Sequence, residues 1–114
     1  MTQPDRTVFA INLFSMLPGV DPAEFEHFSD TVDRPTCLAH RDIVKGFDAY
    51  RVTEAPDGAP ADILEVMHVA DWAAWEQIRD NDPSMRQVME GFNKLVDPAS
   101  VRTYFTRPIL GEPR

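Results

Sequence analysis

The stretch Asp62-Ile63-Leu64-Glu65-Val66-Met67-His68-Val69 predicts a β-strand. Alternate residues of a strand point to opposite faces, so Glu65 shares one face with three apolar side chains, those of Ile63, Met67 and Val69. Asp71 follows almost at once and is typical of a helix N-cap. The helix that it predicts carries an apolar stripe of Trp72, Trp75 and Ile78.

Outward from this strand and helix, the same signals predict the remaining elements. Three further strands are expected at Thr7–Leu17, Ile43–Thr53 and Ser100–Pro108. Two further helices are expected, one from Asp21 to about Arg34 and one that begins at Pro83. The order strand, helix, strand, strand, helix pair, strand indicates an α+β, ferredoxin-like βαββαβ fold with a four-stranded antiparallel sheet. At this length we expect residues 1–114 to form a single domain.

The helices of such a fold cover only one face of the sheet. We expect a second apolar face made by Val8, Ala10, Phe14, Leu64 and Val66. An exposed face of this kind is buried when two copies of the sheet pack against each other. The sequence therefore predicts a homodimer with the arrangement of a dimeric α/β barrel.

Composition excludes several classes of partner. Eleven basic residues against nineteen acidic ones give a net charge of −8, which disfavours nucleic acids and anionic membranes as partners. The longest apolar runs are too short for a membrane span, and the first residues lack the apolar core of a signal peptide. A single cysteine, Cys37, excludes an intramolecular disulfide and suits a reducing compartment. We expect a cytoplasmic protein.

Asp33 lies at a position that helix physics does not favour. Pro35 is expected to end the first helix, because the residue before a proline avoids the α region. Asp33 would then lie at the negative end of the helix dipole, which costs an anion roughly 0.3–1 kcal/mol. Such a placement indicates a tertiary or functional reason. The alternative is a solvated carboxylate, or one paired with Arg34 or Arg41.

Glu65 is the second unusual carboxylate, because its neighbours on that strand face are apolar. Burying a carboxylate there is costly unless it is paired or protonated, and desolvation would raise its pKa toward neutrality. Such a group is suited to general acid or base chemistry. The alternative is a Glu65 that reaches water or pairs with Arg51. If its face of the strand meets the first helix, Glu65 and Asp33 line one cleft.

Other polar residues are weaker candidates for a site. Asn12 interrupts an apolar strand, and His40 follows the first helix in a connection of residues 37–42, where binding residues often lie. Cys37 is expected to be a packed thiol. No His, Cys or carboxylate residues show metal-ligand spacing, and the common nucleotide and nucleophile motifs are missing from the sequence. We therefore expect no metal and no cofactor.

Four segments together resemble a known family. They are Leu17-Pro18-Gly19-Val20-Asp21-Pro22-Ala23, Asp33-x-Pro35-Thr36, Phe47-x-x-Tyr50-Arg51-Val52 and Ile63-Leu64-Glu65-Val66-Met67-x-Val69. In their order and spacing these segments are similar to the RedY-like proteins, also called the REDY-like HapK family. The resemblance covers roughly Val8 to Ile109. The chain departs from the family pattern between His40 and Lys45, and in having His68 where an acidic residue is common.

The resemblance implies a dimeric α/β barrel and a role in the biosynthesis of pyrrole- or indole-derived natural products. It implies a cofactor-independent cyclase, in which Asp33 and Glu65 transfer protons on an aromatic small-molecule substrate. Residues that would orient the polar groups of this substrate are Asn12, Thr36, His40 and Tyr50. Two alternatives stay open, a non-catalytic binding protein for a hydrophobic metabolite and a cofactorless monooxygenase.

Overall fold

The computed structural model describes residues 7–57 and 61–109. Its sheet has four antiparallel strands in the order β2-β3-β1-β4. The strands are β1 (Val8–Phe14), β2 (Val44–Arg51), β3 (Ile63–Val69) and β4 (Arg102–Thr106). This strand order, with a helical segment after β1 and another after β3, confirms the predicted α+β, ferredoxin-like fold. The expected domain of residues 1–114 also includes residues 1–6, 58–60 and 110–114, which lie outside the described residues.

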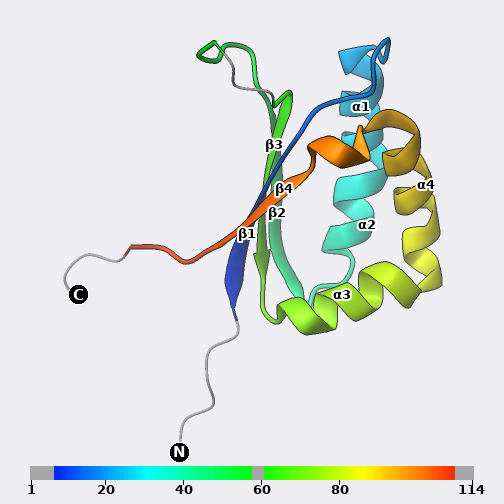
Figure 1. The fold of residues 1–114 in the computed structure, drawn as a ribbon. Helices are drawn as coiled ribbons and strands as arrows, with labels where there is room; N and C mark the ends of the chain where they lie inside the picture. Colours follow the sequence, from blue (N-terminus) through cyan, green and yellow to red (C-terminus); the bar gives the residue numbers. More distant parts are fainter. Residues whose placement is uncertain (1–6, 58–60, 110–114) are drawn as a thin grey trace, which may run out of the picture.

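All of the labelled helices lie on one side of the sheet (Figure 1). They are α1 (Pro22–Phe28), α2 (Arg34–Leu38), α3 (Trp72–Asn81) and α4 (Arg86–Leu95), with short 3-10 turns at Pro83–Met85 and Pro98–Ser100. The predicted N-cap of Asp71 forms, since Asp71 accepts a hydrogen bond from the Ala74 N–H. Asp21 caps α1 in the same way, by accepting one from the Ala23 N–H. Among the described residues, no helix has the length and apolar character needed to cross a membrane.

The first helix does not end at Pro35, and that prediction is wrong. A π-helical turn, η1 (Ser29–Asp33), joins α1 to α2 and carries the helical path on to Leu38, so Cys37 is helical rather than part of a connection. The Arg34 N–H donates to the Ser29 carbonyl, five residues back. Pro35 thus stands in the first turn of a new α-helical segment, where its missing N–H is tolerated.

The face assignment of β1 also needs correction. Ala10 and Phe14 are buried under the helices, and Val8 packs against the same core, so these three residues do not belong to the open face. Their register partners across β3 are Met67, Ile63 and Val69, which are buried as well. The alternating residues on the open face are instead Phe9, Ile11 and Leu13, next to Leu64 and Val66. Because side chains alternate along a strand, an assignment that is wrong by one residue places every side chain on the opposite face.

Two packed clusters join the sheet to the helices. One surrounds Trp75 and Met67, and the other contains Phe14, Phe25 and Phe28. Helix α4 approaches α1 closely because Gly91 faces the Phe28 ring, where a Cβ atom would lie 2.2 Å from a ring carbon. The pairing of β2 with β3 is irregular at one point, since the register shifts between Val44 and Gly46. These clusters hold the helices over the middle of the sheet.

Candidate functional site

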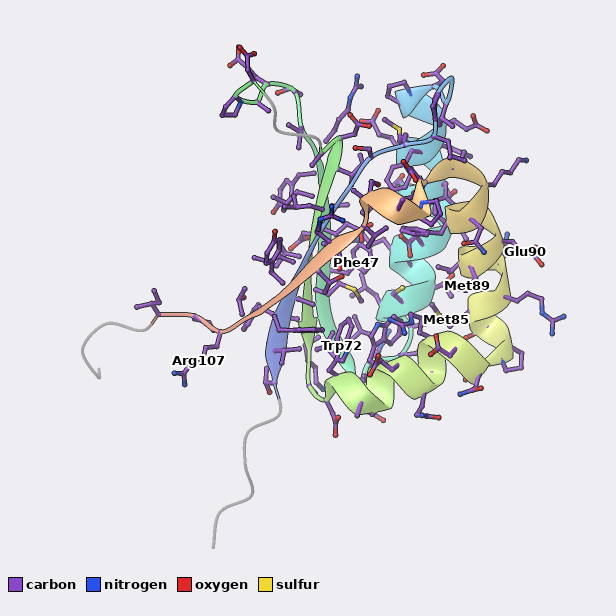
Figure 2. All side chains as sticks on the ribbon, in the orientation of Figure 1. Phe47, Trp72, Met85, Met89, Glu90 and Arg107 are labelled. Carbon is purple, nitrogen blue, oxygen red and sulfur yellow. The ribbon has the colours of Figure 1, made fainter. Side chains whose placement is uncertain are left out.

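A cavity of about 320 Å³ lies between the sheet and the helices. Its walls are mostly aromatic, aliphatic and sulfur side chains, those of Phe14, Phe47, Met67, Trp72, Trp75, Met85, Val88, Met89, Phe92 and Val101. Figure 2 shows Phe47 on the helix side of the sheet, Trp72 at the start of α3, and Met85 and Met89 on the helical layer opposite. The polar lining residues are Asn12, Asp33, Cys37, Glu65, Arg79, Asp80 and Thr103.

Glu65 reaches this cavity from the middle of β3 and is only 4 % exposed. Its Oε1 atom accepts a hydrogen bond from Asn12 Nδ2 at 3.5 Å, and its Oε2 atom has no hydrogen-bond partner. The proposed pairing with Arg51 does not form, because Arg51 instead contacts Glu26 Oε2 at 3.5 Å. Glu65 is therefore a buried carboxyl group with one free oxygen atom.

Asp33 reaches the same cavity from the π-helical turn and is 5 % exposed. The Cys37 thiol, one turn later, donates to Asp33 Oδ1 at 3.5 Å. The alternative of a solvated or arginine-paired Asp33 is wrong, since Arg34 donates to the Phe47 carbonyl at 2.7 Å and lies 3.7 Å from Asp48. The wide π turn thus leaves Asp33 buried, next to a thiol and facing the cavity.

Burial shifts the protonation of both carboxyl groups toward neutral pH. Desolvation raises the pKa of Asp33 to about 6, against the opposing effect of the Cys37 hydrogen bond. Desolvation and then the Asp33 charge raise the pKa of Glu65 to about 8, against the opposing effect of the Asn12 hydrogen bond. Two interacting acids of this kind titrate as a pair, and near neutral pH the pair holds one proton. One carboxyl group can then accept a proton while the other donates one.

Cys37 is a packed thiol in this structure, 2 % exposed. Desolvation, the Asp33 charge and hydrogen bond, and the Glu65 charge all raise the pKa of this thiol. It therefore remains protonated and serves as a hydrogen-bond donor to Asp33, because only the thiolate is nucleophilic.

The cavity brings together only part of the predicted site. Asp33, Glu65 and Asn12 line it, whereas Thr36, His40 and Tyr50 do not. His40 lies in a surface hollow, where its Nε2 atom is 3.0 Å from Ser84 Oγ. Tyr50 is 57 % exposed, and its register partner Leu64 belongs to the open face of the sheet.

Sequence reasoning missed Thr103, which lines the cavity from the edge strand β4. Its hydroxyl donates to Asn12 Oδ1 at 2.7 Å. Thr103 is the register partner of Asn12, so only the strand pairing would have revealed it. Among residues 7–57 and 61–109, the structure contains no cluster of three or more His, Cys, Asp and Glu side chains arranged for a metal ion.

The family model described as REDY-like protein HapK matches residues 8–109. The crystal structure of HapK from Hahella chejuensis is similar with a TM-score of 0.71 and 19 % identity, covering 94 % of this chain and 98 % of that one. A search of curated proteins gave no match.

Other solved structures share the fold at low sequence identity. A DABB family protein with a ferredoxin-like fold from Mesorhizobium loti has a TM-score of 0.63 and 19 % identity, covering 92 % of this chain and 98 % of that one. A dimeric protein of unknown function with a ferredoxin-like fold from Bacteroides fragilis has a TM-score of 0.61 and 11 % identity. The match covers 88 % of this chain and 94 % of that one.

Proposed function

The chain belongs to the REDY-like protein HapK family, and from this premise we propose that it is a cofactor-independent acid–base enzyme of natural-product biosynthesis. The reaction that we propose is the cyclisation of an aromatic, pyrrole- or indole-type intermediate. The observation that carries the proposal is a pair of buried carboxyl groups, Asp33 and Glu65, in a cavity with aromatic walls. The preference of such a pair for a single proton suits it to simultaneous proton removal and donation.

In this proposal Asp33 is the base, because its carboxylate accepts the Cys37 thiol hydrogen bond, and Glu65 is the acid, because its Oε2 atom is buried and has no partner. In the proposed step Asp33 takes a proton from the nucleophilic N–H or C–H group of the substrate. That atom forms a bond to a carbonyl carbon, while Glu65 gives its proton to the carbonyl oxygen. Return of one proton from Asp33 to Glu65 restores the site, so no electron acceptor is needed. Positioned proton transfer of this kind contributes about 10²–10⁴-fold to a rate.

The walls of the cavity are suited to holding the substrate in a reactive conformation. Trp72 and Trp75 offer aromatic surfaces, and Met85 and Met89 offer flexible apolar ones that adapt to an irregular ligand. Asn12 remains a candidate for orienting a polar group of the substrate. Thr36, His40 and Tyr50 have no assigned role in this proposal, because they lie outside the cavity lining.

Binding is tested by titrating indole-3-carbaldehyde into the protein in a calorimeter. The variant Met89→Asp places a charge in the apolar lining of the cavity, and we expect it to raise the Kd about 10-fold or more. The loss of an apolar contact worth about 1 kcal/mol would alone raise the Kd about fivefold. Gln87→Asp, on an exposed position of α4, is the matched control and is expected to bind like the wild type. Equal binding by both variants would argue against this cavity as the ligand site.

The open face of the sheet supports the proposal of a homodimer. Phe9 stacks on His68 there with ring centroids 4.3 Å apart, and Tyr50 and Tyr104 are 57 % and 54 % exposed. No helix of the described chain covers this face (Figure 1). The solved relatives from Bacteroides fragilis and Thermobifida fusca are described as dimeric.

Sedimentation analysis should give twice the 12.9 kDa chain mass. We expect Ile11→Glu, in the middle of the open face, to yield monomers, because two copies would bury unpaired charges. Lys94→Glu, a charge change on the exposed surface of α4, is expected to leave the dimer intact. A wild-type protein that sediments as a monomer would refute the homodimer.

A further inference from the structure

A row of three polar side chains crosses the sheet on the face that carries the cavity. Glu65 on β3 is the register partner of Asn12 on β1, and Asn12 is the register partner of Thr103 on β4. The next pairs on this face are apolar, Ala10 with Met67 and Phe14 with Ile63. The row therefore begins at the exposed edge strand and ends at the buried carboxyl group of Glu65.

The geometry of this row fixes the orientation of the Asn12 amide. Thr103 Oγ1 lies 2.7 Å from Asn12 Oδ1, a distance typical of an O–H···O hydrogen bond and shorter than most N–H···O bonds. With its oxygen held toward Thr103, Asn12 directs Nδ2 to Glu65 Oε1 at 3.5 Å. In this orientation the amide offers Glu65 only N–H groups, because its oxygen atom faces Thr103.

The Asn12 contact makes the two oxygen atoms of Glu65 different. Oε1 accepts the amide N–H, and the carbonyl oxygen of a carboxylic acid is a better acceptor than its hydroxyl oxygen, so the acidic proton belongs on Oε2. Oε2 is buried and has no hydrogen-bond partner, and Glu65 lines the cavity. A buried unpaired oxygen is costly unless a ligand satisfies it.

We infer that Thr103, acting through Asn12, is a positioning residue that leaves Glu65 Oε2 as the atom that exchanges a proton with the bound ligand. This inference rests on the proposed acid–base function and adds the atom that reacts. Thr103 itself lies on an exposed edge strand, so loss of its hydroxyl changes the site more than the stability of the fold.

The test replaces Thr103 and follows the titration of Glu65 by NMR of carbon-13-labelled glutamate carboxyl groups. In Thr103→Val the Asn12 amide is free to turn its oxygen toward the protonated Glu65, so we expect the Glu65 midpoint to rise by about half a pH unit or more. Thr103→Ser keeps the hydroxyl and should restore the wild-type midpoint. Thr106→Val is the matched control, because Thr106 lies on the same strand and its hydroxyl donates to the Phe9 carbonyl at 2.8 Å.

Other charged groups around Glu65 must be kept constant in this test. The charge of Asp33 from the π-helical turn acts on Glu65, and the charge of Glu65 acts on the Cys37 thiol of α2. Arg79 and Asp80 of α3 line the same cavity. None of them is altered in the Thr103 and Thr106 variants. Thr103→Ala provides a second removal of the hydroxyl, and it should move the midpoint in the same direction as Thr103→Val.

The outcomes separate this inference from the proposed function. An unchanged Glu65 midpoint in both Thr103→Val and Thr103→Ala overturns the positioning role. A raised midpoint in these variants, together with a wild-type midpoint in Thr103→Ser and Thr106→Val, supports it. If the midpoint moves in this way but the wild-type protein shows no acid–base activity, the positioning role stands and the proposed function fails.

Discussion

Replacing Asp33 with Asn is expected to lower the rate of base-catalysed ring opening of a nitrobenzisoxazole by about 100-fold or more. In this reaction a base removes the ring C–H proton, the N–O bond breaks, and a coloured cyanophenolate forms. The rate of this reaction reports on a desolvated carboxylate base beside an aromatic pocket, and the assay does not require the natural substrate to be known. Asp33 is such a base, since it is buried and lines a cavity with aromatic walls. Asn keeps the size of Asp33 but cannot accept the proton.

The measurement is the absorbance of the product as a function of pH. The wild-type rate should rise with pH through the pKa of Asp33, which burial raises to about 6. Asp30→Asn is the matched control, because Asp30 belongs to the same π-helical turn but is exposed. Equal rates for wild type and Asp33→Asn would show that Asp33 is not the base.

Raising the pH from about 5 to about 9 is expected to lower the Tm by on the order of 10 °C. Burial raises the folded-state pKa values of Asp33 and Glu65 above their ordinary values, so the folded state binds protons more tightly than the unfolded state. The stabilisation that these two carboxyl groups contribute is fully present below about pH 4, where both are protonated in the folded and in the unfolded state. It is lost as the pH rises through the folded-state values of about 6 and 8.

The double variant Asp33→Asn, Glu65→Gln serves as the comparison for this pH dependence. Its amides are neutral at every pH, so its Tm should change much less over the same range and exceed the wild-type Tm at about pH 9. The three histidines are the same in both proteins and cancel in the comparison. Parallel Tm curves for the two proteins would mean that the buried carboxyl groups do not determine the pH response.

The order of strands and helices could be predicted because local chemistry marks it. Asp21 and Asp71 cap their helices as their positions indicate, and Glu65 lies among apolar neighbours on the expected face of β3. The end of the first helix could not be predicted in the same way. A π turn before Pro35 depends on hydrogen bonds five residues apart, such as Arg34 to Ser29, which propensities do not encode.

The candidate site was predictable where a residue breaks a local rule. Burying the carboxyl groups of Asp33 and Glu65 costs free energy, and both groups line the cavity. Thr103 breaks no rule, because threonine is common in strands, and its place beside Asn12 follows from the pairing of β1 with β4. The position of His40 in an expected connection favours a binding role, but the fold directs its ring to Ser84 instead.

The π-helical turn Ser29–Asp33 keeps the residues before and after it on one side of the helical path. A helix rotates by about 100° for each residue, so without the wide turn the same residues in an unbroken α-helix would swing the side chains before it away from those after it. Asp33 and the Phe25–Phe28 packing could then no longer both face the protein interior. An insertion of one codon into a plain helix produces such a turn, which adds a side chain at the site and leaves the packing on either side in place.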